Sequence, residues 1–75
     1  MYRVKFASQR VRKQFDKLPF STFKRIDKVI LSLSEDPFPA GVKKLTGVRN
    51  CYRIRVGSYR ITYELNHKKR EVVIS

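Results

Sequence analysis

The chain has 75 residues with one cysteine and one histidine, so we expect residues 1–75 to form a single small domain without an internal disulfide or a structural zinc site. Eighteen Lys and Arg residues against six Asp and Glu give a net charge of +12, which favours polyanionic partners, chiefly nucleic acid. No apolar run is as long as a membrane span or the core of a signal peptide. We therefore expect a soluble, cytoplasmic protein with no membrane partner.

The first forty residues predict one strand and two helices. Residues 2–6 alternate apolar and polar side chains, which is typical of a half-buried strand. Ser8 can cap a first helix that Pro19 ends, and Ser21 or Thr22 can cap a second helix. The apolar positions at helical spacing are Val11, Phe15 and Leu18 in the first helix, then Phe23, Ile26, Val29, Ile30 and Leu33 in the second. Two helices joined by so short a connection form an antiparallel hairpin.

The second half of the chain predicts a loop and three strands. Residues 40–49 follow the proline-rich segment that ends the second helix, and they form a loop with a short extended piece around Val42–Leu45. Two alternating runs within Cys51–Leu65 predict a β-hairpin, and Arg70–Ile74 predicts a last strand after a polar turn. The order β-α-α-β-β-β predicts an α+β fold, a small two-layer domain whose helical hairpin packs on one face of a mainly antiparallel sheet.

Gly57 and Ser58 separate the two runs of the hairpin, and glycine at the first central position fits a type II′ turn. The register that follows from this turn places Arg55 directly opposite Arg60. The other expected pairs are Val56 with Tyr59, Ile54 with Ile61, Arg53 with Thr62, and Tyr52 with Tyr63. Like charges directly opposite one another destabilise a sheet, so we infer that the arginine face binds an anion.

Arg53, Arg55 and Arg60 are the candidate catalytic residues. Their guanidinium groups can bind phosphate oxygens bidentately and stabilise the charge that develops on them, although arginine does not act as a base at neutral pH. RNA carries its own nucleophile in the 2′-OH, so a site that orients the backbone and supplies positive charge can cleave it without a metal or a cofactor. The alternative is a face that binds phosphate without catalysis.

The loop before the hairpin carries three further cations, Lys43, Lys44 and Arg49, which are candidate RNA-binding residues. The alternative for them is an ordinary solvated loop. The excess of positive charge is concentrated near them, because residues 41–75 contain nine Lys and Arg against only Glu64 and Glu71.

Other polar side chains fit catalytic roles less well. His67 lies in the predicted polar turn, away from the arginines. Cys51 is expected opposite Glu64 on the outward face, and it lacks the adjacent histidine that a catalytic cysteine needs. The three tyrosines of the hairpin, Tyr52, Tyr59 and Tyr63, fall on the apolar face, where core packing is expected. The sequence has no phosphate-binding loop, no dinucleotide fingerprint and no pair of carboxylates at metal-binding spacing.

Three segments in chain order, YRVKF, EDPFP and KLTGVRNCYRIRVGSYRITYEL, resemble the RelE/ParE superfamily of bacterial and archaeal toxins, and the similarity covers essentially the whole chain. The resemblance to RelE-like members implies a small basic ribonuclease that enters the ribosomal A site, cuts mRNA and inhibits translation. It also implies a cognate antitoxin that holds the toxin inactive in a hetero-oligomer.

The resemblance implies a role for each arginine of the hairpin. Arg53 and Arg55 match basic residues that contact the RNA backbone and activate the 2′-OH, and Arg60 matches the arginine that stabilises the transition-state phosphate. RelE-like members typically carry lysine at the first two positions. Arginine there weakens a general-base role, because a guanidinium does not give up its proton at neutral pH.

The chain ends at Ser75, before the segment in which active RelE-like toxins carry a further basic residue or histidine and a tyrosine. The resemblance therefore predicts a form that binds RNA better than it cleaves it. ParE-like members share the fold but poison DNA gyrase and lack the arginine set, so a gyrase toxin and an inactive RNA-binding form remain as alternatives. A free-standing basic nucleic-acid-binding domain without an antitoxin is a further one.

Overall fold

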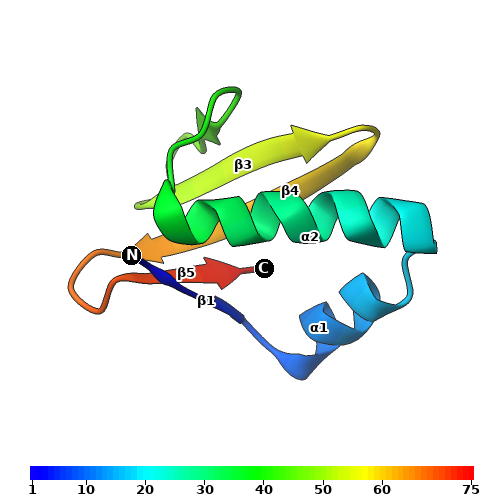
Figure 1. Ribbon diagram of the computed structural model, residues 1–75. Helices are drawn as coiled ribbons and strands as arrows, with labels where there is room; N and C mark the ends of the chain where they lie inside the picture. Colours follow the sequence, from blue (N-terminus) through cyan, green and yellow to red (C-terminus); the bar gives the residue numbers. More distant parts are fainter.

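The computed structural model describes residues 1–75 and has two layers, with two helices on one face of a five-stranded sheet (Figure 1). The elements in chain order are β1 (Arg3–Phe6), α1 (Gln9–Asp16), α2 (Phe20–Glu35), β2 (Lys43–Lys44), β3 (Cys51–Val56), β4 (Tyr59–Asn66) and β5 (Glu71–Ile74). The strands lie in the order β1-β5-β4-β3-β2, with β1 and β5 parallel and all other neighbours antiparallel. The predicted α+β fold is confirmed, and the expected extended piece after the second helix is the two-residue strand β2.

The two helices begin in different ways. Ser8 caps α1 as predicted, because its hydroxyl oxygen accepts a hydrogen bond from the backbone N–H of Val11 at 3.3 Å. The helix α2 begins directly after Pro19, so the prediction that Ser21 or Thr22 caps it is wrong. Pro19 has φ −53°, which the proline ring imposes and which suits a helix start, and no side chain caps this end. Neither helix is long and apolar enough to cross a membrane.

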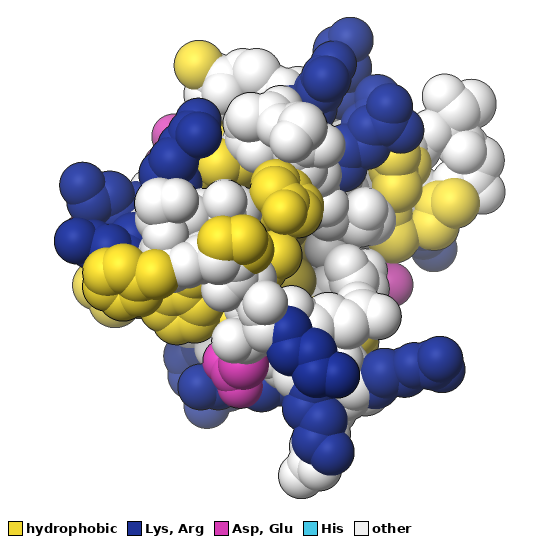
Figure 2. Space-filling view, turned by 90° about the vertical axis from the view of Figure 1, so that its right-hand side faces the viewer, with side chains coloured by type: hydrophobic (Ala, Val, Ile, Leu, Met, Phe, Trp, Pro, Cys, Tyr) yellow, Lys and Arg dark blue, Asp and Glu magenta, His cyan; other side chains and the backbone are white.

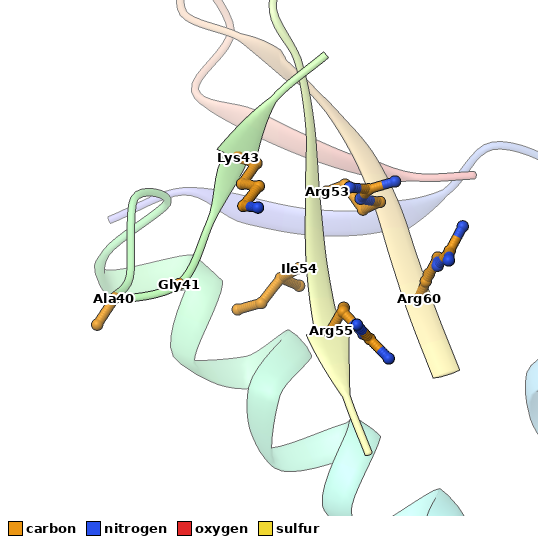
Figure 3. Close-up of a pocket in the computed structure, with 7 residues that line it drawn as sticks. All are labelled: Ala40, Gly41, Lys43, Arg53, Ile54, Arg55 and Arg60. Carbon is orange, nitrogen blue, oxygen red and sulfur yellow. The ribbon is translucent and has the colours of Figure 1, made fainter. Parts of the chain in front are cut away.

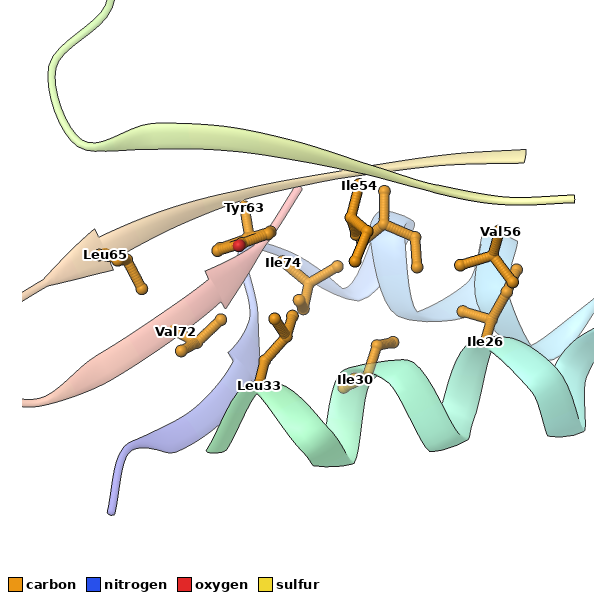
Figure 4. Packing of buried hydrophobic residues seen from close by; sticks show 10 residues of the cluster. Ile26, Ile30, Leu33, Ile54, Val56, Tyr63, Leu65, Val72 and Ile74 are labelled. Atoms are coloured by element: carbon orange, nitrogen blue, oxygen red, sulfur yellow. The ribbon is translucent and has the colours of Figure 1, made fainter. Parts of the chain in front are cut away.

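The hydrophobic core lies between α2 and the sheet (Figure 4). Side chains alternate along each strand, so one face of the sheet points toward the helices. Tyr63 lies fully inside this core, and its hydroxyl donates a hydrogen bond to the carbonyl of Pro37 at 2.7 Å, which ties the end of α2 to the sheet. The ten residues that make up this core are Ile26, Ile30, Leu33, Ile54, Val56, Ile61, Tyr63, Leu65, Val72 and Ile74.

Two residues at strand ends differ from the prediction. Arg70 was expected to start the last strand, but its φ of +53° places it in the turn, and β5 begins one residue later. Tyr59 was expected in the core, yet 39% of its surface is exposed. The reason is that β5 is short. Its last residue, Ile74, pairs with Tyr63, so the hairpin tip extends beyond the end of β5 and Tyr59 has no side chain of β5 beside it.

Candidate functional site

The turn of the β3–β4 hairpin determines how the arginines are presented. Gly57 has a φ of +62°, which glycine adopts readily, whereas Ser58 has no positive φ, and this combination is the predicted type II′ turn. Every predicted cross-strand pair of the hairpin is present. Arg55 and Arg60 therefore lie directly opposite one another on the sheet face away from the helices.

All three arginines of the hairpin line one cavity of about 270 Å³ beside β3 (Figure 3). Arg53 and Arg55 extend from β3, and Arg60 extends from the neighbouring strand β4. Lys43 joins them from β2, because its Cα pairs with that of Arg53 in the ladder. The rest of the lining is Ala40, Gly41 and Ile54.

No acidic side chain balances these four cations. The three ion pairs of the protein lie on α1 and at the β1–β5 edge of the sheet: Arg12 with Asp16 at 3.4 Å, Arg3 with Glu71 at 3.7 Å, and Lys5 with Glu71 at 3.5 Å. Glu64 lies on the same sheet face as the arginines but accepts a weak hydrogen bond from the Cys51 thiol, with 4.0 Å between sulfur and oxygen. The sheet is thus compensated at one edge and strongly positive around β2, β3 and β4.

The cavity can bind a phosphate group of an extended polyanion. Guanidinium groups offer several N–H donors in a planar arrangement that matches two phosphate oxygens, and an ammonium group adds a further positive charge. The lining contains no carboxylate and no imidazole, the groups that most often take a proton from a substrate hydroxyl. The geometry therefore supplies binding and charge stabilisation.

The chain is similar in sequence to toxins of type II toxin–antitoxin systems. Residues 6–75 match the sequence model of the family described as ParE toxin of type II toxin-antitoxin system, parDE. The chain is also 32% identical over 69 residues to the candidate toxin RelE1 of Methanocaldococcus jannaschii, and the match covers 88% of this chain and 77% of that protein. The chain belongs to the RelE/ParE superfamily of type II toxins.

Solved structures of the superfamily have the same fold. The isolated Escherichia coli RelE toxin superposes with a TM-score of 0.85 at 28% identity, covering 99% of this chain and 79% of that one. The RelE–RelB complex of Pyrococcus horikoshii gives 0.84 at 35% identity, with 97% and 88% covered. The toxin–antitoxin complex RelBE2 of Mycobacterium tuberculosis gives 0.80 at 27% identity, with 97% and 90% covered.

In this toxin the three loop cations separate. Lys43 lines the arginine cavity, but Lys44 pairs with Tyr52, and the alternation of side chains directs it to the opposite side of β2. Arg49 lines a different hollow, of about 400 Å³, at the other end of β3 and β4. The structure thus brings one of the three predicted RNA-binding residues together with the arginines.

His67 lies in the turn after β4, as expected, and belongs to an aromatic cluster. The Tyr2 hydroxyl lies 3.2 Å from its Nδ1 atom, and the ring of Phe38 stacks on it with centroids 6.5 Å apart. His67 is seven residues beyond Arg60, so roughly 23 Å of extended strand separates them. It therefore lies too far away to serve the arginine cavity.

Sequence reasoning missed one part of this site and one neighbour of its hairpin turn. Ala40 and Gly41 form a wall of the cavity, and the only signal for them was that a loop precedes the hairpin. Arg25 of α2 reaches the hairpin turn from the helical layer: a β-carbon at Gly57 would lie 3.4 Å from its Nη1 atom. Arg25 lies outside the apolar positions of the second helix, and nothing in the sequence relates it to the hairpin turn.

Proposed function

We propose that this toxin is a ribosome-dependent mRNA endoribonuclease of the RelE type that inhibits translation. The cavity in which Arg53, Arg55 and Arg60 meet Lys43 without an acidic partner carries the proposal. Four cations that the fold leaves unneutralised suit the phosphate backbone of RNA. Because RNA contains its own nucleophile, orientation of the 2′-OH and stabilisation of the phosphate charge are the main contributions required of the protein.

In the proposed reaction, the 2′-oxygen of one nucleotide attacks the adjacent phosphorus, and the bond from phosphorus to the 5′-oxygen breaks. The products are a 2′,3′-cyclic phosphate and a 5′-hydroxyl end. Arg53 and Arg55 hold the backbone, and Arg60 binds the phosphate oxygens on which charge accumulates. Water accepts the 2′-OH proton, since the cavity lining has no carboxylate or imidazole, and either water or the Lys43 ammonium group supplies a proton to the leaving 5′-oxygen. We therefore expect RNA binding to be strong relative to the rate of cleavage.

A translation extract that contains a defined mRNA tests this proposal. We expect cuts within the codon in the ribosomal A site of translated mRNA, none in the same RNA without ribosomes, and 2′,3′-cyclic phosphate at the new ends. A triple Arg53→Gln, Arg55→Gln, Arg60→Gln variant should leave the mRNA intact, whereas Arg3→Gln, at the compensated edge of the sheet, should not. Intact mRNA in the presence of ribosome-bound wild-type protein contradicts the enzymatic proposal and favours an inactive RNA-binding form.

We also propose that a cognate antitoxin binds this toxin and forms a hetero-oligomer with it. The solved relatives from P. horikoshii and M. tuberculosis are complexes of this kind. An antitoxin rich in Asp and Glu would complement the net charge of +12. Co-purification of this chain with the acidic product of a neighbouring gene, and recovery of translation when that product is added, are the expected results.

The match to the ParE family model favours a second candidate, a toxin that acts on DNA gyrase. This candidate predicts gyrase-dependent DNA breaks and no effect in a translation extract. The arginine cavity is not needed for it, so the triple arginine variant should remain toxic. Inhibition of translation that disappears in that variant contradicts the gyrase candidate.

A further inference from the structure

Arg25 extends from the second turn of α2 to the tip of the β3–β4 hairpin. A β-carbon placed on Gly57 would lie 3.4 Å from its Nη1 atom, 3.6 Å from Nη2 and 3.8 Å from Cζ. The guanidinium group therefore lies against the turn with its two terminal nitrogens nearest to it. The glycine permits the positive φ of the turn, and Arg25 lies within van der Waals distance of the position that a β-carbon would take.

The guanidinium group of Arg25 has no partner within the protein. It makes no ion pair, and it donates no hydrogen bond to a side chain or to the backbone of the turn. The nearest acid in sequence, Asp27, is two positions further along α2 and lies about 200° around the helix. The residue is exposed, so its N–H donors are available to an external acceptor.

Arg25 continues the row of cations that begins in the arginine cavity. Gly57 is two residues from Arg55, so their Cα atoms are at most about 7 Å apart, and Arg60 follows the turn on the other strand. Figure 2 shows the side of the molecule that carries the hairpin tip and the start of α2; separate Lys and Arg side chains lie around its outline, with hydrophobic side chains between them, and few acids are visible. Arg25 thus adds a positive charge on the helical side of the turn that joins Arg55 to Arg60.

We propose that Arg25 is a phosphate-binding residue of the RNA site. This rests on the proposed function and extends it, because the RNA strand held in the arginine cavity would continue past the hairpin tip to Arg25. Arg55 and Arg60 would bind the phosphate at the reacting position, and Arg25 a phosphate further along the same strand. The residue is then a determinant of the length of RNA that binds and of its path over the toxin.

The test is the binding of labelled single-stranded RNA, measured by fluorescence anisotropy at several salt concentrations, for Arg25→Gln and two matched variants. Arg55→Gln removes a cation of the cavity. Arg10→Gln removes an exposed arginine of the helix α1, and this helix contacts β1 at the other edge of the sheet from the arginine cavity. We expect Arg25→Gln to weaken the binding of an RNA of about 16 nucleotides roughly tenfold and to reduce the slope of log K against log salt by about 0.7, as one lost phosphate contact predicts. An RNA of about four nucleotides, confined to the cavity, should bind this variant as it binds the wild type.

The three variants separate the two proposals. Arg55→Gln should weaken the binding of both RNAs, and Arg10→Gln should leave the salt slope unchanged. If Arg25→Gln behaves like Arg10→Gln while Arg55→Gln loses affinity, the role of Arg25 is refuted and the proposed function stands. If Arg55→Gln also binds as the wild type does, the arginine cavity is not an RNA site. A lower melting temperature of Arg25→Gln with an unchanged salt slope would show that Arg25 only supports the turn. Arg25→Lys keeps the positive charge, so its salt slope should equal that of the wild type if the RNA contacts the charge.

Discussion

Arg55 and Arg60 occupy positions that folding alone disfavours. Their Cα atoms pair directly across the hairpin, both side chains are exposed, and neither has an acidic partner. A directly opposed pair of like charges costs a sheet about 0.2–1 kcal/mol. The glutamate at the β1–β5 edge shows that the same sheet can compensate its cations elsewhere. We infer that the arginine pair reflects a requirement for binding an anion.

Replacing Arg55 by Thr should therefore stabilise the fold while it weakens RNA binding. We expect the free energy of unfolding to rise by about 0.2–1 kcal/mol, because the repulsion is removed and threonine suits a strand. Urea unfolding at low and at high salt measures this, and the gain should shrink at high salt, where the charges are screened. Arg3→Thr is the matched control, since it removes a cation that Glu71 already balances, and it should give no gain.

Tyr63 should make the stability depend on pH in the alkaline range. Burial, together with the nearby Tyr52 and Asp36, raises the pKa of its phenol from 10.0 to about 12. The folded protein thus holds this proton more tightly than the unfolded chain, so the contribution is complete below pH 10 and is lost as the pH rises toward 12.

The variant Tyr63→Phe has no phenol proton to lose and tests this prediction. It should be less stable near neutral pH, because the carbonyl of Pro37 loses its donor, but its stability should fall less steeply above pH 10. Urea unfolding on both sides of pH 10 compares the two proteins. Equal slopes above pH 10 would mean that the phenol does not titrate differently in the folded state.

At the level of secondary-structure elements, the two helix starts make a direct comparison. Ser8 caps α1 through its side chain, whereas Ser21 lies inside the first turn of α2 and caps nothing. We expect Ser8→Ala to lower the free energy of unfolding by about 1 kcal/mol, and Ser21→Ala to leave it nearly unchanged. Chemical denaturation of both variants measures the difference, and an equal loss in the two would contradict the assignment of the caps.

The strands and their register could be predicted from the sequence, because the strict alternation around Gly57 and Ser58 allows one pairing that puts all apolar residues on one face. The start of α2 could not, since Ser21 and Pro19 are both residues typical of helix starts and only the three-dimensional structure distinguishes them. Arg70 was misassigned for a related reason: a left-handed backbone angle at a residue other than glycine leaves no mark in the alternation pattern.

The candidate site was predictable only within the hairpin. The register brings Arg53, Arg55 and Arg60 together without any information beyond the alternation of side chains. Arg49 and Lys43 look equivalent in the sequence, and they separate because β2 has only two residues and the chain then leaves the sheet. Arg25 could not be predicted, because its contact with the turn joins two layers of the fold.

At the scale of the whole molecule, a core of ten buried residues supports 75 residues. Domains of this size have a free energy of unfolding of roughly 4–11 kcal/mol. Leu33 of α2 has no exposed surface, so Leu33→Ala should lower that value by about 2–5 kcal/mol and lower the melting temperature markedly. Leu31→Ala, on the same helix but 60% exposed, is the control that should change little. Circular dichroism during thermal unfolding measures both, and similar melting temperatures would contradict the core described above.

The parallel pairing of β1 with β5 links the two ends of the described chain, and this has a consequence for how the toxin is made. Protein synthesis adds about 5–20 residues per second, so β5 follows β1 after roughly 3–14 s. During this interval the arginine hairpin can already exist, but the layer that supports it has a gap where β5 belongs. The sheet can therefore close only after both of its parallel neighbours, sixty-eight positions apart in the sequence, have left the ribosome, so its completion is a late event in the synthesis of this domain.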